Sequence, residues 1–140
     1  MAVTSIPTVP TRFHPAHAFV LGGAVALFLG AMLSDLAYWS TYEIQWNNFA
    51  SWLIAGALVV SAVAVLWALV DLFGRSYRGR AAYPALMVLT WILGFVNALV
   101  HARDGWASMP AGLILSVIVV LLACAAAWTA SNRVRTGELP

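Results

Sequence analysis

The chain has 140 residues, of which 63% are hydrophobic and 9% charged, and its mean hydropathy is +0.89. We do not expect a water-soluble monomer, because soluble domains carry roughly 25% charged residues. The seven basic residues are all arginines and are spread too thinly to form a nucleic-acid-binding stripe. The length accommodates about four membrane spans and leaves no room for a soluble catalytic domain, so no enzymatic activity of its own is expected.

Four long apolar stretches predict four transmembrane helices. We place these spans at about residues 15–38, 47–71, 81–101 and 108–131. Because backbone polar groups in hydrocarbon must be paired internally, the expected fold is all-α, an up-down-up-down four-helix membrane bundle forming one domain over residues 1–140. Ser40 and Glu43 match a capping box, which predicts a short interfacial helix or an early start of the second span.

Positive charge is distributed unevenly between the two ends of the expected bundle. Only Arg103 lies on the side opposite the N terminus. The side of the N terminus has six arginines: Arg12, Arg75, Arg78, Arg80, Arg133 and Arg135. By the positive-inside rule, both termini of this multi-pass protein are expected in the cytoplasm.

Small residues at intervals of four mark faces on which membrane helices approach closely. These residues are Gly22, Ala26 and Gly30 in the first span and Thr90, Gly94 and Ala98 in the third. We call each of these two rows of small residues a ridge, and we expect the ridges to face each other or a second copy of the chain.

A polar seam runs along the third span. Thr90, Gly94, Asn97 and His101 follow one another at steps of four, three and four, which places them on one helical face pointing into the bundle. Asn97 lies about one turn inside the membrane. His101 is expected at the wet boundary itself, where loss of a polar side chain costs little folding energy.

The first and third spans run in the same direction, so their noncytoplasmic ends lie at the same depth. One polar group is therefore expected there: Asp35, Tyr38, Trp46, Asn97, His101, Arg103, Asp104 and Trp106. It forms either a docking or cofactor pocket or a hydrogen-bonded helix end anchored at the interface. A second group, at the cytoplasmic side, consists of His14, His17 and Asp71, and reads as a solvated helix-end network or as an alternative site.

A b-type haem would need two axial ligands on facing helices at matched depth. The candidate pairs are His101 with Met32 and His17 with Met87. A quinone would need hydrogen-bond donors such as His101 or Trp106 beside an apolar slot. Neither cofactor is certain from the sequence.

Two other functions have less support in the sequence. The single cysteine, Cys124, offers no thiolate metal site, and no metal is expected. A small transporter needs a hydrophilic path, whereas the second and fourth spans carry few polar residues beyond Ser61 and Ser116.

Several short motifs resemble one family of bacterial membrane proteins. They are His14-Pro15-Ala16-His17, Ser34-Asp35-Leu36-Ala37-Tyr38, Glu43-Ile44-Gln45-Trp46, Trp52-Leu53-Ile54-Ala55-Gly56 and His101-Ala102-Arg103-Asp104-Gly105-Trp106. In order and spacing they are similar to the domain of unknown function 2231, over nearly the whole chain. Relatives often have a proline in the first span, where this chain has Gly22-Gly23, so the resemblance does not imply a kink here.

The resemblance implies a small four-helix protein of the bacterial inner membrane. Relatives are sometimes encoded near, or joined to, cytochrome c modules and quinoprotein sugar dehydrogenases. We therefore expect a nonenzymatic accessory or anchoring subunit for a periplasmic or respiratory redox partner. A haem- or quinone-binding electron-transfer module is the alternative, and a small transporter a further one. The expected partners are the lipid bilayer, a periplasmic quinoprotein dehydrogenase or cytochrome c, or a second copy of the chain.

Overall fold

The computed structural model describes residues 15–74, 81–103 and 105–135. These ranges contain four long helices, α1 Pro15–Thr41, α2 Ile44–Gly74, α3 Ala82–His101 and α4 Ala111–Arg135, and a short 3₁₀ helix, η1 Gly105–Ser108. Each α-helix contains a segment long and apolar enough to cross a membrane. The prediction of an all-α fold with four candidate spans is confirmed.

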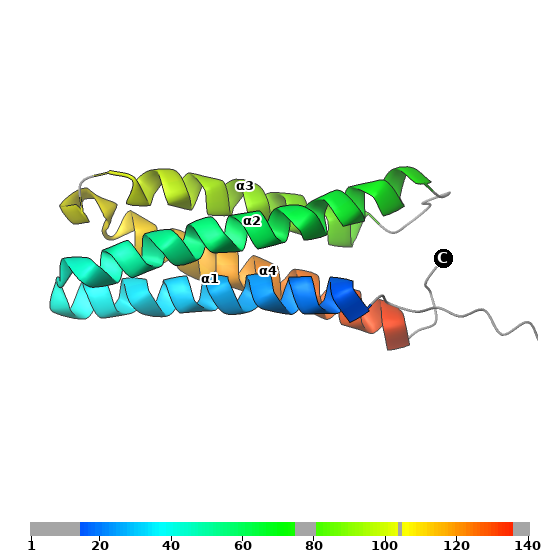
Figure 1. Cartoon of the computed structure of the whole chain (residues 1–140), viewed down its shortest axis with the longest axis horizontal. Helices are drawn as coiled ribbons and strands as arrows, with labels where there is room; N and C mark the ends of the chain where they lie inside the picture. Colours follow the sequence, from blue (N-terminus) through cyan, green and yellow to red (C-terminus); the bar gives the residue numbers. More distant parts are fainter. Residues whose placement is uncertain (1–14, 75–80, 104, 136–140) are drawn as a thin grey trace, which may run out of the picture.

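Neighbouring helices run in opposite directions and lie side by side (Figure 1). α1 packs on α2, α2 on α3, α3 on α4 and α4 on α1, so the helices form a closed ring. α1 and α3 are therefore parallel to each other across the diagonal of the bundle. This is the predicted up-down-up-down arrangement. We name its two ends after their buried histidines, the His101 end and the His17 end.

The inward face of each helix repeats at alternating steps of three and four residues. The buried positions include His17, Leu21, Ala24, Phe28, Ala31, Asp35 and Tyr38 in α1, and Asn47, Ala50, Ile54, Ala57, Ser61, Ala64 and Ala68 in α2. This alternation keeps one stripe of each helix against its neighbours, as in left-handed coiled coils. The polar seam predicted for α3 belongs to the same pattern, because Thr90, Gly94, Asn97 and His101 are all buried.

The row of small residues predicted as a packing face of α1, Gly22, Ala26 and Gly30, is not the face on which α1 approaches its neighbours. An added Cβ at Gly22 would meet no atom within 4 Å, and Ala26 is exposed. Gly30 alone faces a neighbour, Leu53 of α2. Steps of four advance about 40° around a helix each time, so this ridge turns away from the bundle.

The ridge of α3 meets a large side chain instead of the ridge of α1. Gly94 is buried, and an added Cβ there would lie 3.2 Å from both Phe28 of α1 and Leu58 of α2. Ala98 is only partly buried. The two ridges therefore do not face each other within one chain. The small residues at the contacts are instead the buried alanines of α2 and α4: Ala50, Ala57, Ala64, Ala68, Ala123, Ala126 and Ala130.

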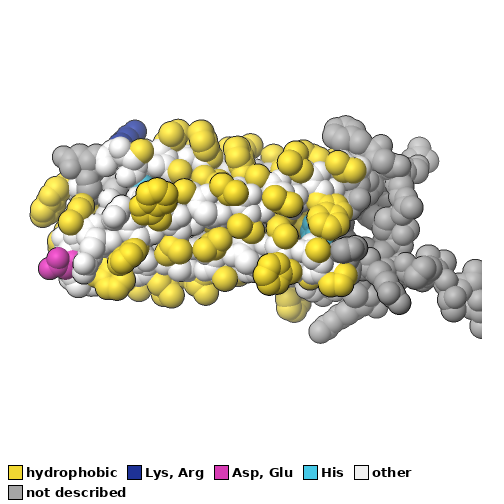
Figure 2. All heavy atoms as spheres, viewed as in Figure 1, with side chains coloured by type: hydrophobic (Ala, Val, Ile, Leu, Met, Phe, Trp, Pro, Cys, Tyr) yellow, Lys and Arg dark blue, Asp and Glu magenta, His cyan; other side chains and the backbone are white. Residues whose placement is uncertain are grey.

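The outer surface of the bundle is apolar along its length. Figure 2 shows hydrophobic side chains distributed from one end of the visible face to the other. Large side chains among those most exposed are Phe19, Trp52, Val59, Val70 and Trp128. Such a surface fits a lipid bilayer and not water, because contiguous exposed apolar patches are rare on soluble monomers.

The turn between α1 and α2 differs from the predicted capping box. Ser40 lies inside α1, where its hydroxyl donates to the carbonyl of Ala37, 2.9 Å away. α1 ends one residue later, and Tyr42 follows with a φ of 55°, a left-handed conformation that terminates helices. Thr41 Oγ1 accepts from the backbone N–H of Glu43 at 3.3 Å. The capping box is wrong, whereas the early start of the second helix is observed.

Three of the four helices, α1, α2 and α4, are longer than the spans predicted from hydropathy, whereas α3 matches its predicted span to within one residue. α1 continues to 41 instead of 38, and α2 runs over 44–74 instead of 47–71. α4 runs over 111–135 instead of 108–131, because η1 occupies the residues before it. Hydropathy marks only the part of a helix that lies in hydrocarbon, so the polar ends of the helices are missed.

Candidate functional site

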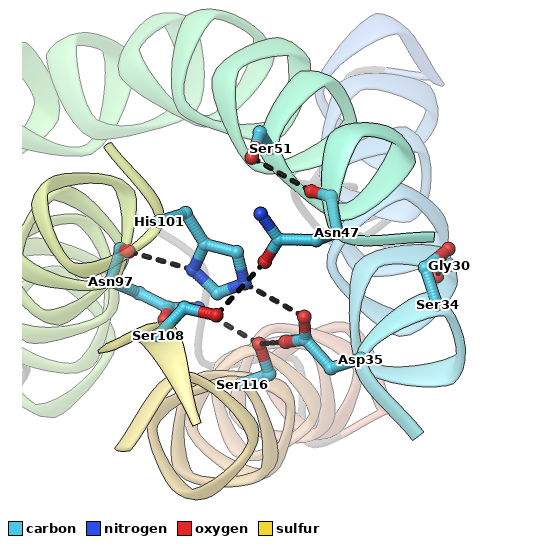
Figure 3. Close-up of polar contacts among 9 residues, drawn as sticks. All are labelled: Gly30, Ser34, Asp35, Asn47, Ser51, Asn97, His101, Ser108 and Ser116. Carbon is cyan, nitrogen blue, oxygen red and sulfur yellow. Dashed lines mark hydrogen bonds and ion pairs between the residues drawn. The ribbon is translucent and has the colours of Figure 1, made fainter. Parts of the chain in front are cut away.

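Four polar side chains from three helices converge in the core at the His101 end (Figure 3). Asp35 comes from α1, Asn97 and His101 from α3, and Ser116 from α4. Their exposed fractions are 0%, 1%, 5% and 2%, respectively. We call these four residues the polar cluster. Asp35, Asn97 and His101 were predicted to lie together, and the structure brings them into one hydrogen-bonded network.

The centre of the polar cluster is the contact between His101 and Asp35. His101 Nε2 lies 2.7 Å from Asp35 Oδ1. Its other ring nitrogen, Nδ1, lies 2.9 Å from the backbone oxygen of Asn97. Ser116 Oγ donates to Asp35 Oδ2 at 2.5 Å and accepts from Asn97 Nδ2 at 2.8 Å. Both carboxylate oxygens and both ring nitrogens are therefore engaged.

The positions of protons in the polar cluster follow from what each group can accept. A backbone carbonyl only accepts, so His101 Nδ1 must carry a proton. One further proton lies between Nε2 and Asp35 Oδ1, on either the ring or the carboxyl group. In both arrangements the pair has no net charge, and this neutrality suits a buried position at membrane depth.

Burial makes this contact costly to break. A buried ion pair or shared-proton pair contributes little net stability against an apolar replacement, but removing one partner leaves the other unpaired at a cost of about 3–5 kcal/mol. One acceptor in the polar cluster, Asn97 Oδ1, has no hydrogen-bond partner among the described residues. The expectation that His101 lies at a wet boundary is wrong, because its side chain is bonded and buried.

A second polar contact lies next to the polar cluster at the His101 end (Figure 3). Ser108 of η1 is fully buried, and its hydroxyl donates to Asn47 Oδ1 of α2 at 3.0 Å. Gly112 of α4 lies against the imidazole, since an added Cβ would be 2.8 Å from His101 Cε1. Every helix of the bundle thus contacts this site, directly or through η1.

The aromatic residues predicted for this end separate into a buried and an exposed part. Tyr38 is buried and makes an edge contact with Tyr42, with ring centroids 6.0 Å apart. Tyr42 stacks on Trp106 at 5.6 Å and 15°, and Trp106 is 73% exposed. Trp46 is partly buried and contacts Phe49.

Of the charged residues predicted for the site, Asp35 belongs to the polar cluster and Arg103 does not. Arg103 is exposed beyond the end of α3. Asp104 lies outside the described residues. The described ranges contain no group of three or more His, Cys, Asp or Glu side chains arranged to hold a metal ion.

The group predicted at the opposite end is built around a different partner. His17 Nε2 lies 2.5 Å from the hydroxyl of Tyr83 in α3 and makes an edge contact with the ring of Trp67 at 5.2 Å. Tyr83 was not among the predicted site residues. His14 and the side chain of Asp71, proposed as members of this group, lie outside what the structure describes.

The methionines named as haem ligands lie in the apolar core. Met87 belongs to the buried cluster that contains Tyr83, and Met32 packs against the cluster around Phe28. As axial ligands through Nε2, His101 and His17 would each have to give up the hydrogen bond that Nε2 makes. Haem or quinone binding stays a prediction from the sequence.

Sequence reasoning missed the hydroxyl and amide groups that complete the site. Ser116 bridges Asp35 and Asn97, although it was noted only as a rare polar residue of the fourth span. Asn47 and Ser108 were not singled out. A signal was present for Ser116, because a lone hydroxyl in an otherwise apolar span usually hydrogen-bonds to another helix.

Comparison with known proteins agrees with the membrane architecture. A family model described as Predicted membrane protein (DUF2231) matches residues 13–136. No curated protein and no solved structure matches the chain. Since the family description names no activity, a function has to be argued from the site itself.

Proposed function

We propose that this chain, which belongs to the DUF2231 family of predicted membrane proteins, is an accessory subunit that holds a redox partner at the membrane surface. In this proposal the membrane is the bacterial inner membrane and the His101 end faces the periplasm. The partner is a soluble cytochrome c or quinoprotein dehydrogenase. The observation that carries the proposal is the exposed ring of Trp106, which is stacked on Tyr42 at the same end of the bundle as the polar cluster.

Trp106 has the features of an anchor residue for protein binding. Binding energy at interfaces is concentrated in a few large aromatic or arginine side chains whose positions are fixed before binding. Trp106 belongs to η1, in the link between two helices, and its ring is braced by Tyr42. The exposed rings of Trp52 and Trp128 lie instead on the sides of α2 and α4, where lipid is the expected neighbour.

The proposed orientation rests on the arginine distribution and can be tested directly. Single cysteines at Ser40, in the turn of the His101 end, and at Ser76, between the second and third spans, would be exposed to an impermeant thiol reagent in intact cells. We expect labelling of Ser40→Cys and none of Ser76→Cys. Labelling of Ser76→Cys alone would place the His101 end in the cytoplasm.

Site-specific photo-cross-linking tests the docking role. A benzophenone amino acid replaces Trp106 in one variant and Trp128 in another, because both rings are about equally exposed but lie at opposite ends. After irradiation of bacterial membranes, cross-linked bands are stained for covalently bound haem and for quinone cofactors. We expect a stained band from the Trp106 position and none from the Trp128 position.

Two outcomes would contradict the docking role. One is the same cross-linked band from both positions, which indicates a lipid-side neighbour. The other is a Trp106 band that stains for neither cofactor, which rules out a redox protein of these two classes. The alternative function, an electron carrier with its own haem or quinone, has less support because Nε2 of both candidate histidines is already hydrogen-bonded.

A further inference from the structure

The chain that carries Trp106 is fixed at both ends by groups around the polar cluster. His101 is the last residue of α3, and the chain passes from it through a short link into η1. At the other end of η1, Ser108 is buried and bonded to Asn47. We call residues 105–108 the η1 segment. Its two attachments, to His101 along the chain and to Asn47 through Ser108, both lie at the polar cluster (Figure 3).

The first turns of α4 give the ring little freedom while it is bonded to Asp35. An added Cβ at Gly112 would be 2.8 Å from His101 Cε1 and 3.3 Å from Nε2, so the α4 backbone lies directly against the ring. Ser116, one turn further, holds the other carboxylate oxygen of Asp35. The imidazole is thus enclosed by Asp35 on one side and by α4 on another, and η1 lies next to α3 and leads into this part of α4.

We propose that the Asp35–His101 pair is a proton-binding site, and that uptake of a second proton from water releases His101 and displaces the η1 segment with Trp106. The functional consequence rests on the docking role proposed above, because displacement of Trp106 would then regulate partner binding. A hydronium ion gives up one proton, which forms an O–H bond on Asp35 when the shared proton lies on the ring, or an N–H bond on His101 when it lies on the carboxyl group. The product is the same in both cases, an imidazolium beside a neutral carboxyl group, and no other covalent bond changes.

The sign of the effect follows from charge. With one shared proton the pair is neutral, and both groups are bonded. With two protons the imidazolium has lost its anionic partner, and an uncompensated charge buried at membrane depth is strongly unfavourable. His101 lies at the end of its helix, so a short movement brings it to water. Acid therefore favours the open form.

The surroundings of the pair supply no other described ionisable group to absorb this charge. α2 contributes Asn47, α4 contributes Ser116 and η1 contributes Ser108, none of which titrates. On α1 the next inward side chain is the phenol of Tyr38. The charged side chains described at this end, Glu43 and Arg103, are exposed and face water.

Thiol accessibility in the full-length protein tests this proposal. In a Cys124→Ala background, Ser108→Cys reports on the buried face of the η1 segment, and Ala107→Cys is the exposed reference. Reaction with dithiodipyridine is followed in lipid nanodiscs from about pH 8 to about pH 3, which spans the ordinary ionisation of His and Asp. We expect the rate ratio of Ser108→Cys to Ala107→Cys to rise about tenfold per pH unit on acidification, as for one proton.

Two controls separate a local switch from acid unfolding. Ala126→Cys is fully buried near the His17 end and should stay unreactive throughout the range. Adding Asp35→Asn together with His101→Gln, which removes both groups that can take up the proton, should make the rate ratio independent of pH. A constant ratio with Asp35 intact, or a parallel rise at Ala126→Cys, overturns the proposal.

A second measurement needs no substitution. Hydrogen exchange of the backbone amides over 105–108, corrected for the intrinsic effect of pH, should accelerate in acid relative to amides in the middle of α4. No relative acceleration overturns the proposal even if the cysteine variants fail to fold. Neither measurement involves a partner, so failure here leaves the cross-linking test at Trp106 unaffected, and the reverse also holds.

Discussion

The two ends of the bundle use the same geometry for two different contacts. Each pairs a residue of α1 with a residue of α3 that lies 66 positions later, Asp35 with His101 and His17 with Tyr83. Along each helix the two positions are 18 residues apart, which is five turns at about 3.6 residues per turn. The two contacts therefore lie on the same faces of the same helices, across the same diagonal.

The chemistry at the two ends differs despite this shared geometry. At the His101 end a carboxyl group and an imidazole share a proton and are joined by Ser116 and Asn97. At the His17 end the partner is a phenol, which hydrogen-bonds as an uncharged group, beside the ring of Trp67. Both contacts therefore hold α1 against α3. Only the contact between Asp35 and His101 contains groups whose charge can change with pH in the proposed mechanism.

The largest expected effect is the difference between removing the α1 partner at each end. Asp35→Ala leaves the buried His101 and Ser116 without their shared acceptor, so we expect a loss of about 3–5 kcal/mol. His17→Ala removes the hydrogen bond between His17 and the Tyr83 hydroxyl, and the loss should be about 1–3 kcal/mol. Unfolding in mixed micelles with increasing dodecyl sulfate measures both.

Equal losses in the two variants would contradict this ranking, since they would show that the carboxyl group contributes no more than the phenol. Leu36→Ala is the reference substitution. It lies next to Asp35 in the chain but is exposed on the outer surface. Its effect should be small, because its side chain leaves no cavity in the core.

The second effect concerns the two serines noted in the apolar spans. Ser116→Ala removes both the donor to Asp35 and the acceptor for Asn97, so a loss of about 2–3 kcal/mol is expected. Ser61→Ala removes only a 3.3 Å contact with a carbonyl of its own helix, and less than about 0.5 kcal/mol should be lost. Thermal midpoints in one detergent compare them. A similar shift for both would show that Ser116 makes no interhelical contact of consequence.

The smallest expected effect is the change in stability when a glycine in each half of the bundle is replaced by alanine. Gly112→Ala places a methyl group 2.8 Å from His101 Cε1 and should destabilise by about 1–2 kcal/mol, because the ring or the α4 backbone must shift to admit it. Gly22→Ala meets open space in the interior of α1 and should stabilise by up to about 1 kcal/mol. The same thermal measurement decides the sign of each. A neutral Gly112→Ala would show that the ring has room to move without opening the site.

Three of the four residues of the polar cluster could be predicted from the spacing of polar residues along α3 and from the direction of α1. The spacing of Asn97 and His101 in α3 indicates an inward seam, and the parallel direction of α1 and α3 brings Asp35 to the same depth. What the spacing cannot indicate is how deeply each side chain is enclosed. The end of α3 at His101 indicates a boundary residue, yet its ring is buried against Asp35 of α1 and Gly112 of α4.

The residues that were missed share one property. The residues Ser116, Asn47 and Tyr83 each form a hydrogen bond with a residue of another helix. The residues next to them in the sequence do not indicate which residue that partner is. The prediction that the two ridges of small residues face each other is wrong for a related reason. Small residues at steps of four look like a contact face, but which face of an apolar helix turns inward is set by its neighbours.

The amino-acid sequence by itself determined the number of helices, their antiparallel order and the depth of their polar residues. These properties depend on the length and hydropathy of local segments, and hydrocarbon admits no other backbone arrangement for such segments. Only the tertiary structure decided the rotation of each helix about its axis. With apolar side chains on every face, burial in lipid and burial in protein are nearly equivalent, so packing and interhelical hydrogen bonds select the inward face.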